Sequence, residues 1–319
     1  MSDLFTEALN APAGRLAEVV LGKITKGSGG ELSDDVRTRL DRLVDAPGRA
    51  GLLARVRLAR DVAFLYDHAP NWTTSRIVPL FDWSSPDSAS VWSARKYSGY
   101  IGSPELFGLV KQSFLQIFGG SDTPPEDLRT FAEWLTAILI VNHANKAGYP
   151  LLDTEARSAL RRAGDTALSS VGHQLAVEMG SATPEEKVKR WQTVVGPVFR
   201  AIWPLDVDLQ TSAATFQLVQ ILLATGDAFP EAADIIVPFI RPDDPRAHAT
   251  IFSIAEASDA LFQAAPAKML DLIAAVVGEA LPGSVYALGK ALTRLRAVDP
   301  CLADTRKFQK LLVYASQHG

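Results

Sequence analysis

The stretch Gly22-Lys23-Ile24-Thr25, which precedes further glycines, is the first place where side chains and backbone could bind phosphate. A phosphate-binding loop needs Gly-x-x-x-x-Gly-Lys-Ser/Thr between a strand and a helix, so that backbone amides surround the phosphate. Here Ala17 stands where the first glycine is required, Ile24 follows the lysine, and no strand is predicted before it. We therefore interpret this stretch as the end of a surface helix that is followed by a flexible loop at 26–30.

Asp206-Val207-Asp208 has the Asp-x-Asp spacing of phosphotransferases in which one aspartate is the nucleophile and the next is an acid. That chemistry requires the pair at the end of a buried parallel strand. The preceding residues instead predict a helix that ends at Pro204, and Gln210 occupies a position expected to hold Thr or Val. The sequence therefore predicts a turn between helices here.

The other reactive side chains form no recognisable constellation. Cys301, the single cysteine, follows Asp299-Pro300 at a predicted helix entry, and we interpret it as half-buried packing rather than as a nucleophile. No Gly-x-Ser-x-Gly elbow is present. The histidines lie far apart, and no two share the i, i+3 or i+4 spacing of a helical metal site; they are His68, His143, His173, His248 and His318. We predict no catalytic, cofactor-binding or metal-binding residues and no cofactor.

The tryptophans fall mostly within apolar stripes, where core packing is their expected role. They are Trp72, Trp83, Trp92, Trp134, Trp191 and Trp203. An exposed indole among the first three would instead be a candidate anchor for a partner protein.

Composition limits the classes of protein that remain. With 319 residues, 47% of them hydrophobic, the chain is expected to be globular. Its apolar runs fall short of the ~20 residues of a membrane helix, and the acidic start argues against a secretory signal, so we predict a cytoplasmic location and no membrane partner. A net charge of −4 argues against duplex nucleic acid as a partner. The arginines between Arg37 and Arg60 alternate with aspartates, which is typical of a salt-bridged surface.

Apolar residues recur with the period of a helix and almost never alternate as in a strand, which predicts an all-α fold. Ser103-Pro104, Thr123-Pro124 and Thr183-Pro184 are typical helix starts, and a break is expected near Gly164. The predicted helices are 3–9, 12–25, 33–46, 50–68, 70–81, 86–94, 104–118, 124–146, 153–179, 184–203, 210–225, 229–240, 247–262, 266–280, 284–297 and 303–316.

Short connections, mostly of ~3–8 residues, favour antiparallel packing of consecutive helices. Later helix pairs have the length of α-solenoid repeats, about 35–40 residues, but no clean sequence period. We predict an irregular HEAT-like α-solenoid of about 14–16 helices, with an irregular bundle as the alternative. One continuous domain is expected over 1–319, with sub-arrays 1–180 and 181–319 as a finer division. The loop 242–245 is expected to be stiff and polar.

Three blocks of packing and turn residues carry a resemblance to a known family. Residues 8–18, Ala-Leu-Asn-Ala-Pro-Ala-Gly-Arg-Leu-Ala-Glu, resemble the Ala-Leu-Asn-x-Pro-x-Gly-Arg-x-Ala-Glu signature in the helical C-terminal regions of large bacterial anti-phage defence proteins of the sirtuin-domain type. Residues 79–83 with Trp92 and 106–115 are similar to the next block, although 93–100 depart from its Trp-x-Gly-x-Leu core. Trp191, Pro197, 203–204, 226–232 and 236–238 are similar to the third.

The resemblance implies a helical sensor or scaffold that recognises a protein and relays this to an effector. The sirtuin module's glycine-rich strand-turn-helix and catalytic histidine have no counterpart here, so no catalytic residue is carried over. It also implies that the chain is the C-terminal piece of a longer protein or a separate subunit made from that piece. The expected partner is an effector module, a phage protein or a further copy of the chain.

Two other classes stay open. The first is a helical enzyme or small-ligand receptor with an inter-helix pocket lined by Asn142, His143, Asn145 or His173. The second is nucleic-acid binding through the arginine-rich region at 37–60.

Overall fold

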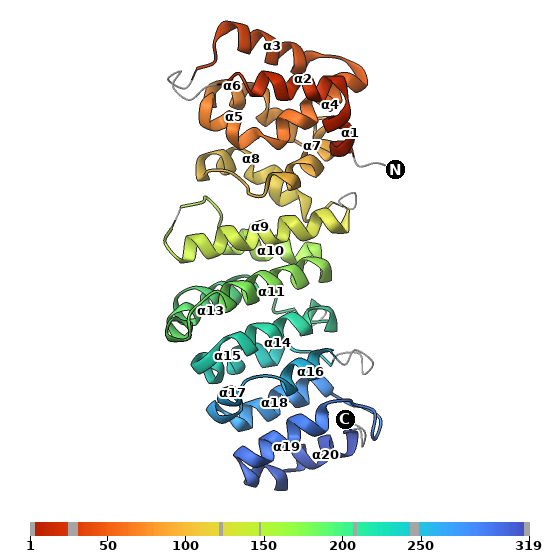
Figure 1. Cartoon of the computed structure of the whole chain (residues 1–319), viewed down its shortest axis with the longest axis vertical. Helices are drawn as coiled ribbons and strands as arrows, with labels where there is room; N and C mark the ends of the chain where they lie inside the picture. Colours follow the sequence, from red (N-terminus) through yellow and green to blue (C-terminus); the bar gives the residue numbers. More distant parts are fainter. Residues whose placement is uncertain are drawn as a thin grey trace. The chain divides into compact units, whose positions relative to one another are not determined.

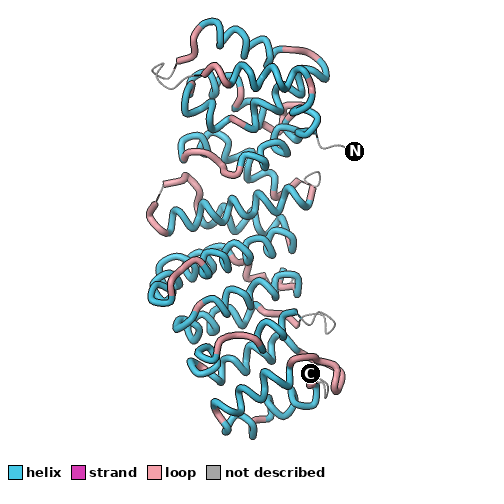
Figure 2. The backbone as a smooth tube through the Cα atoms, in the orientation of Figure 1, coloured by secondary structure: helices cyan, strands magenta, loops and turns pink. Residues whose placement is uncertain are grey.

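The computed structural model describes residues 4–24, 31–120, 124–146, 148–206, 209–242 and 249–315. The predicted all-α class is confirmed, because these residues form helices, turns and one isolated bridge between Val285 and Ala315, with no strand among them (Figure 2). The predicted loop at 26–30 and most of that at 242–245 lie outside the described residues.

The chain divides into two compact units, whose boundary falls inside helix α9 (Pro125–His143). Unit 1 comprises 1–134 and 147–152, and unit 2 comprises 135–146 and 153–319. The first part of α9 thus packs within unit 1 and the remainder within unit 2. The single continuous domain and its division near residue 180 stay predictions.

Unit 1 contains eight α-helices before α9, counted over its described residues (Figure 1). Ser33 and Ser103 cap α3 and α8 by accepting hydrogen bonds from the amides of Val36 and Leu106. The helices are α1 (Leu4–Asn10), α2 (Pro12–Leu21), α3 (Asp34–Asp45), α4 (Gly48–Arg60), α5 (Val62–His68), α6 (Pro70–Arg76), α7 (Ser88–Arg95) and α8 (Pro104–Ile117), with 3-10 turns η1 (Val78–Phe81) and η2 (Lys96–Ser98).

Helix α4 is the centre of unit 1, where it packs against α1, α2, α3 and α7. Leu53, Val56 and Leu58 of α4 are buried in this core. The end of α3 comes so close that a Cβ on Gly51 would lie 1.7 Å from the carbonyl oxygen of Ala46. Only glycine at position 51 allows this approach.

Unit 2 is built from short helices that pack in pairs. Its helices after α9 are α10 (Asp153–Ala163), α11 (Asp165–Gly180), α12 (Lys187–Arg190), α13 (Gly196–Ile202), α14 (Thr215–Ala224), α15 (Phe229–Ile236), α16 (Ala249–Ala255), α17 (Asp259–Ala264), α18 (Pro266–Val277), α19 (Leu288–Val298) and α20 (Arg306–Tyr314). The 3-10 turns are η3 (Pro184–Glu186), η6 (Ser212–Ala214), η7 (Gly226–Ala228), η8 (Val237–Phe239) and η9 (Pro300–Asp304), and a π-helical turn, η4 (Trp191–Val195), joins α12 to α13.

Within unit 2, helices separated by one or two others in the chain contact one another in two series. Helix α11 packs on α14, α14 on α16 and α16 on α19, while α15 packs on α18 and α18 on α20. Neighbours in sequence, such as α14 with α15 and α19 with α20, connect the two series. This is the connectivity of stacked helical pairs. A HEAT-like solenoid through the entire chain stays a prediction.

Several predicted helices are divided in the structure. The break near Gly164 is confirmed, because this residue separates α10 from α11 with φ of 70°. The continuous helix predicted over 50–68 is wrong: Asp61 separates α4 from α5, and its carboxylate accepts hydrogen bonds from Arg57 and Arg60. The helix predicted from 284 begins only at Leu288, because Ala287 adopts φ of 60°.

Candidate functional site

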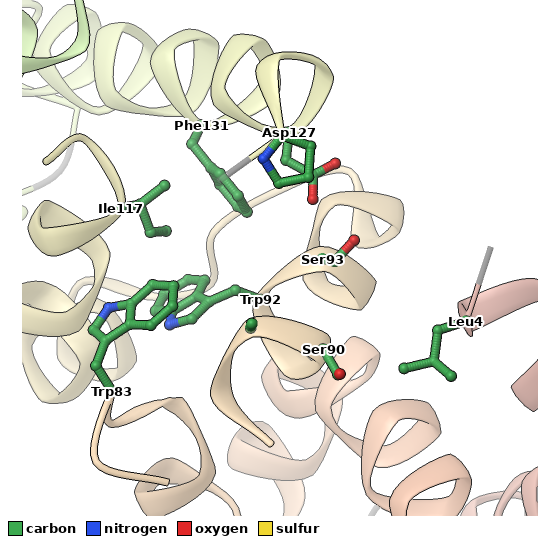
Figure 3. A pocket seen from close by; sticks show the side chains of 10 residues that line it. Leu4, Trp83, Ser90, Trp92, Ser93, Ile117, Asp127 and Phe131 are labelled. Atoms are coloured by element: carbon green, nitrogen blue, oxygen red, sulfur yellow. The ribbon is translucent and has the colours of Figure 1, made fainter. Parts of the chain in front are cut away.

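The first candidate site is a pocket of about 260 Å³ in unit 1, here called the aromatic pocket (Figure 3). Helices α1, α7, α8 and α9 and the segment after η1 contribute to it. Its lining residues are Leu4, Trp83, Ala89, Ser90, Trp92, Ser93, Ile117, Pro124, Asp127 and Phe131.

Two indoles form one side of the pocket, and backbone carbonyls fix both. The Trp92 Nε1–H donates to the carbonyl oxygen of Phe81 at 3.0 Å, and its ring meets those of Phe81 and Phe131 edge-on, with centroids 4.8 and 5.8 Å apart. The Trp83 Nε1–H donates to the carbonyl oxygen of Ser113 at 2.8 Å. Trp92 is buried, whereas Trp83 is half-buried. The indole N–H groups are therefore engaged, and apolar ring surface lines the pocket (Figure 3).

The opposite side of the pocket is polar. Asp127, in the first turn of α9, forms an ion pair with Lys96, which directly follows α7, and the two side chains are 3% and 15% exposed. Burial lowers the pKa of Lys96, but the hydrogen bond and charge of Asp127 raise it more, so its pKa lies above the ordinary value. Ser90 and Ser93, one turn apart on α7, are half-buried and add hydroxyl groups (Figure 3).

This combination is suited to binding an apolar or aromatic side chain. A preformed concave surface of ring faces with a few polar groups at its edge is the usual composition of a binding pocket. Asp127, the acid of the pocket, is bound to a cation.

A second depression of about 370 Å³ lies between α2, α3 and α4 and is here called the arginine-edged groove. Its apolar residues are mostly small, and both of its charged residues, Arg39 and Arg42, are basic. The lining residues are Ala13, Leu16, Val20, Arg39, Arg42, Leu43, Ala46, Ala50 and Ala54.

The third depression, of about 310 Å³, is in unit 2 and is here called the polar cleft. It lies between the end of α9 and the segment α12–η4, which contributes residues 189 and 190 from α12 and 193 and 194 from η4. The Nε2 atom of His143 is 3.2 Å from Oδ1 of Asp153, and Arg190 is bound to Glu178. The cleft is lined by His143, Ala144, Asn145, Lys146, Glu186, Lys189, Arg190, Thr193 and Val194.

The polar cleft is lined by some, but not all, of the residues predicted to form a small-ligand pocket. His143 and Asn145 line the same cleft, whereas Asn142 is not among its lining residues and His173 is exposed on α11. The surroundings are charged rather than apolar.

The remaining predicted residues have ordinary structural roles. Gly22 caps α2, and Asp206 is bound by Arg161 at 2.9 Å, while Thr25 and 207–208 lie outside the described residues. The Nδ1 atom of His68 is 2.8 Å from the carbonyl oxygen of Phe64; His248 and His318 are outside the described residues.

Cys301 is exposed, so its interpretation as half-buried packing is wrong. Cys301 is the second residue of the 3-10 turn η9, in which the neighbouring Leu302 is buried and the thiol is left at the surface. Over the described ranges, no group of three or more His, Cys, Asp or Glu side chains could hold a metal ion. Among the described helices, none combines the length and apolar character needed to cross a membrane.

The arginine-rich region is largely salt-bridged, as interpreted, but Arg57 is buried rather than at the surface, and Arg42 has no ion pair with a described residue. The pairs are Arg37 with Asp34, Arg39 with Asp35, Arg49 with Glu7, Arg55 with Asp87, and Arg57 and Arg60 with Asp61.

Sequence reasoning pointed to Trp83 and Trp92 but missed the other residues of the aromatic pocket and the whole groove. The i, i+3 serines on either side of Trp92 are a weak signal for a face of α7 that is not fully packed. Nothing in the sequence indicated that Lys96 and Asp127 would pair.

Fold and sites together define an all-α protein with preformed surface depressions. The chain is 21% identical, over 328 aligned positions, to the uncharacterized protein y4cA of Sinorhizobium fredii. The match covers 99% of this chain but 26% of that protein, so the chain spans about a quarter of its relative. No family model matches the sequence, and no solved structure matches it.

Proposed function

We propose that this chain is a non-catalytic helical module that recognises a protein, and that it serves in anti-phage defence as the sequence resemblance implies. The observation that supports recognition is the aromatic pocket, which is preformed, of side-chain size, and lined by a half-buried tryptophan.

The energetics of interfaces favour such a pocket as the centre of a contact. A few buried anchor side chains supply most binding free energy, and they insert into desolvated pockets on the partner. Ring faces of Trp83 and Phe131 would bury an apolar side chain, while Ser90 and Ser93 at the edge could bond to the partner backbone. The pocket therefore fits an aliphatic or aromatic side chain from a protein.

The comparison supports a role as one module of a longer protein. The relative from Sinorhizobium fredii extends far beyond the matched region. In that arrangement the helical module would recognise a partner and another region would respond.

The test is to fill the pocket without removing its core residues. Ser93→Phe places a ring in the pocket from a half-buried position, and Thr38→Phe adds the same ring at an exposed site of α3 as the matched control. The native full-length gene is replaced by each variant, and the plating efficiency of a phage panel is measured beside a gene deletion.

We expect the wild type and Thr38→Phe to protect against phage and Ser93→Phe to lose protection. Both variants are expected to have equal melting temperatures. If deleting the gene leaves the plating efficiency of every phage unchanged, the proposed role in defence is refuted. Protection by Ser93→Phe equal to wild type would remove the pocket from recognition.

The polar cleft favours a second candidate, a receptor for a small polar ligand. His143, Asn145 and Lys189 converge there with a volume adequate for a small ligand. Thermal-shift screening of a metabolite library against wild type and Lys189→Ala tests it: a stabilising ligand whose effect disappears in the variant supports the candidate, and no such ligand argues against it.

A further inference from the structure

The arginine-edged groove combines an apolar floor with side chains too small to fill it. Val20, Leu43 and Ala54 are buried at its base, while Leu16 is 51% exposed at its edge. Ala50 adds another small side chain on α4, one turn from Ala54. Apolar surface is thus left open between three helices.

The charges around this groove are unbalanced because the acids of α3 are already bound. Asp41 accepts hydrogen bonds from Trp72 and Arg76, and Asp45 is bound by Arg76 as well. Asp35 bonds to Arg39 at 2.9 Å. Arg42, which is exposed, has no ion pair or hydrogen bond to another described residue. The groove therefore offers an apolar floor beside a cation that no described residue pairs, in a chain whose net charge is −4.

From this combination we infer that the groove binds an amphipathic helix that carries acidic residues beside its apolar face. A helix lays apolar side chains at i, i+3/i+4 and i+7 into such grooves, and the small alanines allow its backbone to approach closely. Arg42 follows Arg39 by one turn on α3, and because Asp35 already binds Arg39, the carboxylate of the partner is expected to face Arg42. A basic helix would be repelled, and nucleic acid would leave the apolar floor uncovered.

This inference rests on the proposed role in protein recognition but concerns a surface other than the aromatic pocket. The two tests are independent, because the one here is a binding assay on the purified full chain and needs neither phage nor host. If one of the two tests fails, the result of the other can still be interpreted.

The experiment selects displayed helical peptides, randomised at every surface position, on the immobilised full chain. Ala50→Trp, which fills the groove from an exposed position, serves for counter-selection. The expected winners have a net negative charge beside an apolar i, i+3/i+4, i+7 stripe, and salt weakens their binding.

The strongest peptide is then measured by fluorescence anisotropy against two charge reversals on the same helix. Arg42→Glu is expected to weaken binding about tenfold or more, because it places like charge against the peptide carboxylates. Arg37→Glu, at an exposed position outside the groove, is the matched control and is expected to change binding less than about twofold.

The inference would be overturned if the selected peptides were neutral or basic. It would also be overturned if Ala50→Trp bound the peptide as well as wild type, or if Arg42→Glu and Arg37→Glu changed binding equally. A concentration-dependent dimer, seen by sedimentation velocity, that Arg42→Glu dissociates would overturn it too, because the groove would then be occupied by a second copy of the chain.

Discussion

The ion pair between Lys96 and Asp127 makes a quantitative test of how unit 1 is held together. Lys96 follows the C-terminal end of α7, and Asp127 lies in the first turn of α9. Each charge thus also complements the dipole of the helix end beside it. We predict that Asp127→Asn, which keeps the shape and removes the charge, lowers the free energy of unfolding by about 3 kcal/mol.

This magnitude follows from the burial of the pair. Removing one partner of a buried pair costs about 3–5 kcal/mol, because the other charge stays buried without compensation. The lost interaction with the start of α9 adds about 0.5 kcal/mol. Two features reduce this cost. The Lys96 side chain is 15% exposed, so water still reaches its charge. Its Nζ atom also lies 5.0 Å from the centroid of the Tyr97 ring, a cation–π interaction of about 0.5–1 kcal/mol. The lower end of the range is therefore expected.

The assay is urea unfolding of wild type, Asp127→Asn, Lys96→Met and the double variant, followed by tryptophan fluorescence and circular dichroism. The double variant is expected to lose about 2 kcal/mol less than the sum of the single variants. Asp34→Asn is the control, because the Asp34 and Arg37 side chains are 91% and 55% exposed, and an exposed pair contributes about 1 kcal/mol or less. If Asp127→Asn costs no more than this control, and the two single effects simply add, the reasoning is refuted.

Three further outcomes follow from the same structure. Since the pKa of Lys96 is raised, the stability contributed by its pair is undiminished as pH rises from neutral to about 10.5 and is lost as pH rises further through the higher folded pKa, so the stability difference between wild type and Lys96→Met should shrink in that alkaline range. Gly51→Ala should destabilise unit 1 by about 3 kcal/mol, at the upper end of overpacking effects, because the new Cβ would meet the Ala46 carbonyl oxygen; urea unfolding of that variant measures it. Gly196→Ala should destabilise the chain by about 1–2 kcal/mol despite alanine's better helix propensity, because its Cβ would lie 2.8 Å from the Trp191 carbonyl oxygen and 3.1 Å from Cε2 of that indole; an unchanged or raised melting temperature would contradict this.

The helical class was predictable because it depends on local periodicity, but some divisions between helices were not. The break at Gly164 is visible in the sequence, since glycine readily adopts the positive φ found there. The break at Asp61 lies in a continuous apolar pattern and depends on hydrogen bonds from Arg57 and Arg60. The π-helical turn at Trp191 leaves the apolar stripe intact, so periodicity alone predicts an ordinary α-helix there.

The aromatic pocket was beyond sequence reasoning for a related reason. Trp83 and Trp92 are the same residue type, yet one is half-buried and the other buried. Their acceptors differ in distance along the chain: Trp92 donates to Phe81, 11 residues away, whereas Trp83 donates to Ser113, 30 residues away. The exposed ring surface of Trp83 is therefore set by where α8 packs, which a single sequence does not encode locally. Residue type identified Trp83 as a potential anchor, and tertiary packing determined that it lines a pocket.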